Sequence, residues 1–236
     1  MNLIDYILLG VLFVSTLFGL YRGFIASVLG TGGCLIAFGL SFLLGPKLAA
    51  IVQGNVTLQE TLSHYTDISS RIGDLDLALS NVYQLTREKI DQIVANVRLP
   101  EPFAKLLESN LVNQVYAGAD VEQTVQSYLS QTILTACINI ICFLVCFAVL
   151  LLAISLVVAL LKAVFRFPVL KQLDSLAGGA FGLARGCLLC YILMAVAPMV
   201  QTMVPVNQLT DLLDTSVLAP LFSGNNLVLA IMNGGL

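Results

Sequence analysis

Four long stretches without a single charged side chain constrain this chain more than any other feature. A membrane helix needs about 20 mostly apolar residues, each contributing about 1.5 Å of rise, and each stretch supplies one span. Only 11% of the residues are charged, against about 25% in soluble domains. The predicted fold is therefore an all-α integral membrane protein with four transmembrane helices, within the stretches Tyr6–Tyr21, Gly23–Pro46, Gln123–Leu161 and Gly186–Thr210.

The spacing of these stretches predicts two transmembrane hairpins, residues 1–46 and 132–204, separated by a helical extracytoplasmic insert, residues 47–131. In the insert, helices are expected over Ser80–Leu99 and Phe103–Leu111, and a further helix begins near residue 120 and runs on through the third span. These helices could form a small cap on the membrane domain, which we favour, or an apolar groove for a peptide, lipid or partner helix. Residues 205–236 read as an interfacial amphipathic tail, with a helix over Gln208–Phe222 and an apolar run, Leu227–Met232, too short to cross.

Basic residues set the expected orientation, because lysine and arginine are retained on the cytoplasmic side. The two short connections between spans carry five of them, and the flanks of the opposite side carry only Lys47. The N-terminus, the C-terminus and the insert are therefore predicted to be extracytoplasmic. The first span has no basic residue before it, which favours a retained anchor over a cleaved signal. The five residues are Arg22, Lys162, Arg166, Lys171 and Arg185.

Charge and cysteine positions argue against several functional classes. The insert has a net charge of −4, so it offers no basic surface for nucleic acid. All six cysteines fall in the predicted spans, and the single histidine, His64, falls in the insert, so neither a disulfide framework nor a metal site is expected. Cys187 and Cys190 form a lone CxxC within an apolar helix, where small buried hydrophobes are the favoured interpretation. No cofactor is predicted. An enzyme is not expected either, because the predicted spans contain neither paired carboxylates nor a serine–histidine pair.

A short motif occurs twice, FGLYRG at 18–23 and FGLARG at 181–186. In each copy small residues recur every four positions and so share one helix face. Such stripes allow helix backbones to approach closely in lipid, where hydrophobic burial does not drive helices together. We therefore predict a tight helix junction at each motif. The small residues are Gly19, Gly23 and Ser27 in the first copy and Gly178, Gly182 and Gly186 in the second.

The arginines of the two motifs, Arg22 and Arg185, have two possible roles. Each borders an apolar run long enough to cross alone, so both can lie at the cytoplasmic boundary and contact phosphates while their stems follow apolar surface. The alternative is a pair of charges that lines a cavity within the membrane, together with Asp174 and Asn139. The anchor role is favoured, and it makes the motifs packing and anchoring elements that need no ligand.

Together these residues carry a resemblance. The opening Asp5-Tyr6, the pattern GxxRGF at 19–24 and the segment LDSLAGGAFGLARG at 173–186 resemble the colicin V production protein family of bacterial inner-membrane proteins. Ser175 follows Asp174, where family members commonly carry a basic residue. The resemblance implies a four-span protein of the bacterial cytoplasmic membrane, linked to colicin V production or export and to envelope homeostasis, without enzymatic activity.

The expected role is therefore non-enzymatic: the protein assists a membrane process through helix packing and contacts with an envelope protein or a second copy of itself. A small transporter or channel is the alternative.

Overall fold

In the computed structural model, the described residues form helices joined by short segments, and four of these helices are long and apolar enough to cross a membrane. They are α1 (Leu3–Arg22), α2 (Phe24–Gln53), α7 (Val125–Val164) and α8 (Lys171–Met203). This confirms the predicted all-α membrane fold. The structure describes residues 2–55, 75–82, 85–97, 99–117, 123–164, 171–203, 211–213, 215–222 and 225–233. The first part of the insert, with His64, and residues 204–210 of the tail lie outside these ranges.

The first hairpin turns at one glycine. Gly23 adopts φ 81° and ψ 174°, the only positive φ recorded for a glycine in the described residues, and this backbone conformation strains residues with a Cβ. The turn is so tight that α2 starts at Phe24, directly after α1 ends at Arg22. Its backbone groups remain satisfied, because Gly23 donates to the Gly19 carbonyl at 3.1 Å and Ser27 donates to the Gly23 carbonyl at 3.0 Å. Gly23 thus sets the geometry of the hairpin.

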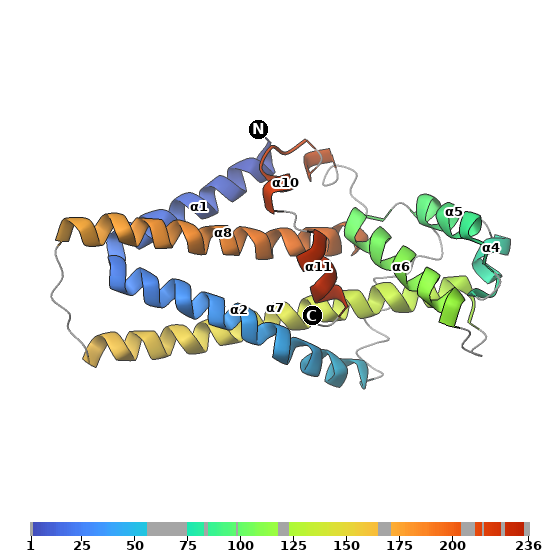
Figure 1. The fold of residues 1–236 in the computed structure, drawn as a ribbon, viewed down its shortest axis with the longest axis horizontal. Helices are drawn as coiled ribbons and strands as arrows, with labels where there is room; N and C mark the ends of the chain where they lie inside the picture. The colour runs from blue at the N-terminus through green and yellow to red at the C-terminus, as the bar shows by residue number, and fades with distance from the viewer. Residues whose placement is uncertain are drawn as a thin grey trace.

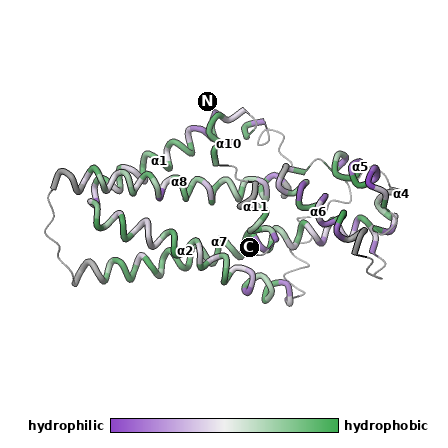
Figure 2. Tube along the Cα trace, in the orientation of Figure 1, coloured by the Kyte–Doolittle hydropathy of each residue, from purple (hydrophilic) through white to green (hydrophobic). Residues whose placement is uncertain are grey.

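The two hairpins interlock rather than standing apart. Helix α1 packs chiefly on α8, and α2 packs on α7 and α8, whereas α1 and α2 have little contact with each other beyond their turn. Figure 1 shows α1 and α2 diverging from the Gly23 turn, with each lying along a helix of the other hairpin. Figure 2 shows that apolar residues dominate these four helices. Many of their large apolar side chains are exposed and face the lipid, among them Phe13, Leu43 and Leu152.

Helix α8 starts much earlier than the fourth charge-free stretch. The sequence analysis placed the fourth span after Arg185, but α8 runs without a break from Lys171 to Met203 and holds Arg185 near its middle. The reason is that residues 175–184 are themselves small or apolar, so they extend the helix with a face that packs on α1. Helix α2 likewise continues beyond the predicted end of its span at Pro46 and ends at Gln53.

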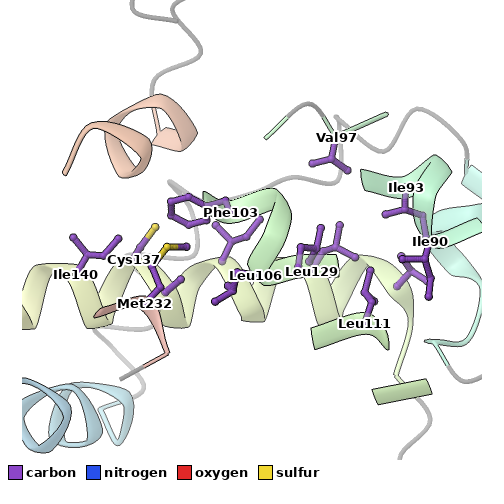
Figure 3. Close-up of a cluster of buried hydrophobic side chains, with 14 of the residues drawn as sticks. Ile90, Ile93, Val97, Phe103, Leu106, Leu111, Leu129, Cys137, Ile140 and Met232 are labelled. Carbon is purple, nitrogen blue, oxygen red and sulfur yellow. The ribbon is translucent and has the colours of Figure 1, made fainter. Parts of the chain in front are cut away.

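A compact cap covers one end of the four helices (Figure 1). It consists of α4 (Leu75–Leu79), α5 (Arg87–Val97), α6 (Glu101–Ala117), the start of α7 and α11 (Asn225–Met232). Figure 3 shows its buried apolar side chains pointing toward one another from α5, α6, α7 and α11. The fully buried members include Ile93, Phe103, Leu107, Leu111 and Leu129.

Two sequence-predicted helices are shorter in the structure than expected. The helix expected over Ser80–Leu99 begins only at Arg87, because Asn81 forms a backbone bridge with Thr124 that ties the preceding segment to the start of α7. The tail helix expected over Gln208–Phe222 is interrupted at residues 215–218, and α10 (Ala219–Phe222) is its last turn. The apolar run Leu227–Met232, which was predicted to be too short to cross, lies in α11, and its end packs against the cap.

Candidate functional site

The closest helix contact in the described residues lies between α1 and α8, at the glycines of the two motifs. A Cβ added to Gly178 would lie 2.5 Å from the Gly19 carbonyl oxygen and 2.7 Å from the Gly23 carbonyl carbon. A Cβ added to Gly182 would lie 2.5 Å from the Ser15 carbonyl oxygen and 3.0 Å from the Gly19 Cα. Real Cβ atoms essentially never come within 3.0 Å of such atoms, so only glycine fits here. The structure therefore brings together the glycine stripes of motifs 163 residues apart.

The glycine contact extends along α1 and is reinforced by hydroxyl groups. A Cβ on Gly186 would lie 3.3 Å from the Leu12 Cα, which carries the contact to the middle of α1. Ser15 Oγ donates to the Gly182 carbonyl at 2.6 Å, and Ser175 Oγ donates to the Leu20 carbonyl at 2.9 Å. Hydrogen bonds of this kind stabilise helix pairs in a membrane by about 1 kcal/mol each. We name this α1–α8 contact, formed by Gly19, Gly178, Gly182 and Gly186, the glycine seam.

Arg185 lies inside the helix bundle rather than at its boundary. Ser175 is level with Leu20 near the end of α1, and Arg185 follows Ser175 by ten residues, or about 15 Å of helix. Its Nε is buried and has no hydrogen-bond partner in the described residues. The Cys34 sulfur of α2 lies against the guanidinium, and a Cβ on Gly30 would be 3.7 Å from its terminal nitrogen. This position differs from the boundary anchor that the sequence analysis favoured, because α8 continues on both sides of Arg185.

Arg22 has a different environment at the end of α1. Its side chain is exposed, and its guanidinium carbon lies 4.2 Å from the centre of the Phe18 ring, a cation–π contact. The end of a membrane helix is where a long basic side chain can reach headgroups, so Arg22 has the geometry of an anchor. Asp174 lies in the first turn of α8, and its side chain is outside the described part of the structure.

Both arginines line two adjoining cavities. The first, about 580 Å³, lies between α1, α2 and α8, and the second, about 1210 Å³, lies between α2 and α7. Of the residues that the structure describes, five line both cavities, and no carboxylate lines either of them. The walls are otherwise mostly apolar. The shared residues are Phe18, Arg22, Ala26, Gly30 and Arg185.

A buried carboxylate near the start of α1 binds the tail. Asp5 is 0% exposed, and one of its oxygens accepts hydrogen bonds from Ser216 Oγ at 2.6 Å, Val217 N at 3.1 Å and Leu218 N at 3.0 Å. Asn2 forms a capping box with Asp5, and its side chain also donates to the Leu212 carbonyl and to Thr215 Oγ1. We name this contact the tail clasp. The sequence analysis used Asp5 only within the family resemblance. Its position could have predicted more, because a carboxylate at the edge of an apolar span needs hydrogen-bond donors around it.

The other polar features of the spans have structural roles. Asn139 of α7 is buried and donates to the Met232 carbonyl at 2.7 Å, which holds α11 against α7. Cys187 and Cys190 are free thiols in α8, and Cys190 is buried against α1, as expected for small apolar residues. In the part of the chain that the structure describes, no group of three or more histidine, cysteine or carboxylate side chains could hold a metal ion.

Comparison with known protein families gives a match over most of the chain. The family model described as "Colicin V production protein" matches residues 4–71 and 97–226, which is most of the chain. The matched ranges include the glycine seam, both arginines, and Asp5 with its tail donors. No curated protein and no solved structure matches the chain.

Proposed function

Because the chain belongs to the colicin V production protein family, we propose that it is a non-enzymatic multi-pass protein of the bacterial cytoplasmic membrane. In this proposal it assists toxin production or export, or envelope homeostasis, by holding a fixed membrane frame against a partner in the membrane or envelope. The partner is an envelope protein or a second copy of the chain.

The observation that carries the proposal is the interlocking of the two hairpins. Transporters built from two repeats alternate their access by rocking one repeat against the other. Here α1 is joined to α8 by the glycine seam, and α2 packs along α7, so a rocking motion would have to open both contacts at once. Close-packed backbones resist such sliding, which supports a fixed frame.

The cap supplies a surface on which a partner could dock. Helix α5 buries Ile90, Ile93 and Val97 and exposes a polar face on its other side. Polar and charged side chains of this kind form the rim of protein interfaces and set their specificity. The exposed residues are Arg87, Glu88, Lys89, Asp91 and Gln92.

Crosslinking in native membranes tests the proposal. We expect a photoreactive residue at Gln92, on the exposed face of α5, to form one discrete protein adduct that mass spectrometry identifies. The matched control is the same residue at Leu152, which is exposed on the apolar surface of α7 and should yield only lipid adducts. If neither Gln92 nor the other exposed cap positions formed a protein adduct, this result would contradict the proposal that the protein works through contacts with a partner.

A small transporter or channel is the second candidate, and the pair of arginines that lines the two cavities favours it. The purified protein in liposomes distinguishes the candidates. A fixed frame predicts no protein-dependent anion flux above that of empty liposomes. Flux that Arg185→Gln abolishes would support the transporter and overturn the frame.

The orientation gives a separate prediction. We propose that the cap and both termini are extracytoplasmic and that the Gly23 turn is cytoplasmic. A cysteine at Gln92 should react with a membrane-impermeant maleimide in intact spheroplasts, whereas a cysteine at Tyr21, which is 91% exposed beside the turn, should react only after permeabilisation. The parent chain is the control, because its six thiols lie in the spans and four of them are buried. The opposite labelling pattern would reverse the proposed orientation.

A further inference from the structure

Two arginines line the same pair of cavities in the bundle. They are Arg22 and Arg185, and among the lining residues that the structure describes there is no carboxylate. The buried Nε of Arg185 also lacks a hydrogen-bond partner in the described residues. A buried N–H of a charged group that lacks an acceptor is costly, so this arrangement calls for an acceptor, for which an anion is best suited.

We propose that this arginine pair binds the anionic phosphate of a membrane phospholipid, with the acyl chains of the lipid lying in the two apolar cavities on either side. Arginine suits this role because its planar fork donates several hydrogen bonds to phosphate oxygens. This site goes beyond the proposed function and does not depend on it, because a fixed frame and a transporter could both hold such a lipid.

The walls of the cavities favour a lipid over a small soluble anion. Away from the arginines, the first cavity is lined by Ile7, Val11 and Val14 of α1 and by Leu189 of α8. The second is lined by the apolar α7 segment 151–159. A free phosphate would leave both apolar cavities unfilled, whereas a phospholipid has two acyl chains and can place one in each cavity. Ligand sites of this size are filled mainly by apolar contact and oriented by a few polar groups.

The helices also leave an entrance from the bilayer. Helices α1 and α2 diverge from the Gly23 turn (Figure 1), and the first cavity lies between them over α8. Ile7 and Phe18 line this cavity and are themselves 48% exposed, so the cavity opens onto the lipid-facing surface. A phospholipid could therefore enter sideways without leaving the membrane.

Native mass spectrometry of the purified protein in detergent tests the site. We expect phosphatidylglycerol, which is net anionic, to be retained at least about tenfold more tightly than phosphatidylcholine. Both lipids carry the phosphate, but the choline ammonium of phosphatidylcholine would lie beside two arginines and repel them. Arg185→Gln should remove this preference, and Arg22→Gln should weaken it. Arg87→Gln removes an exposed arginine of the cap and is the matched control. Equal retention of the two lipids by the parent, or an unchanged preference in Arg185→Gln, would overturn the proposal.

A second pair of variants keeps the test valid if the arginine variants fold poorly. Gly10 lines the first cavity, and a Cβ there meets nothing within 4 Å, so Gly10→Leu should fill the cavity without disturbing the helices and lower phosphatidylglycerol retention severalfold. Gly39→Leu is the control, because Gly39 has equally free space but lines neither cavity. Unchanged retention in Gly10→Leu would contradict the placement of an acyl chain, and displacement of the lipid by millimolar inorganic phosphate would identify a free-anion site instead.

Discussion

Replacing Gly182 with leucine is expected to prevent the chain from accumulating as a folded protein. The first added carbon would lie 2.5 Å from the Ser15 carbonyl oxygen and 3.0 Å from the Gly19 Cα, so backbone atoms, rather than flexible side chains, would have to move. Overpacking a core costs about 1–3 kcal/mol when side chains can yield, and more is expected when two helix backbones must separate. The same separation would break the 2.6 Å hydrogen bond from Ser15 Oγ to the Gly182 carbonyl.

The matched control for this variant is Gly39→Leu, which adds the same side chain to a membrane helix where nothing lies within 4 Å. The measurements are the amount of monodisperse protein after detergent extraction and its melting temperature. We expect Gly39→Leu to behave like the parent, Gly182→Ala to melt at a lower temperature and Gly182→Leu to aggregate. A Gly182→Leu protein with the yield and melting temperature of the parent would show that the glycine seam does not hold the bundle together.

Replacing Asp5 with alanine is expected to release the tail from the start of α1. The carboxylate accepts hydrogen bonds from Ser216 Oγ and from the backbone N–H groups of Val217 and Leu218, and within the described part of the chain these two N–H groups have no other acceptor. Removing a charged acceptor leaves those donors unpaired and loses bonds that are stronger than neutral ones. We expect the amides of Val217 and Leu218 to exchange hydrogen at least about tenfold faster, since each lost bond of this kind changes the opening equilibrium on that scale.

Hydrogen exchange read by mass spectrometry checks this prediction. Asp5→Asn keeps one acceptor oxygen and should give an intermediate rate, while Asp91→Asn, on the exposed face of α5, should leave the tail amides unchanged. Protection of the tail that is identical in Asp5→Ala and the parent would show that other contacts, such as those of Asn2, hold the tail without the carboxylate.

The sequence predicted the four membrane helices well because apolar length alone decides whether a segment can cross a bilayer. The prediction that the fourth span starts after Arg185 was wrong for a related reason. A search for charge-free stretches ends a span at every arginine, although a buried cavity can hold one inside. The structure shows α8 continuing through Arg185 from Lys171 to Met203. Only the packing of α8 on α1 reveals that residues 175–184 belong to the membrane helix.

The elements outside the membrane were harder to predict because long-range contacts determine them. The segment before Arg87 is amphipathic enough to be helical, but the backbone bridge of Asn81 with Thr124 competes with the helix there. The tail clasp joins residues more than 200 positions apart, and no local pattern encodes such a pairing. The four-residue spacing of the glycines in the second motif is a local signal, and Gly178, Gly182 and Gly186 do share the face of α8 that packs on α1. The stripe expected for Gly19, Gly23 and Ser27 was wrong, because Gly23 turns the chain and places Ser27 in α2.

The glycine seam and the tail clasp both join the start of the chain to residues that are synthesised much later, which matters for biogenesis. Helix α1 enters the membrane first, but its main partner is α8, and the donors for Asp5 are synthesised later still. Until synthesis is nearly complete, the glycine face of α1 has no partner helix, and the Asp5 carboxylate has the Asn2 N–H as a donor but none of its donors from the tail. Nascent or truncated chains should therefore be recognised as immature by insertases and membrane proteases, so that only full-length molecules persist.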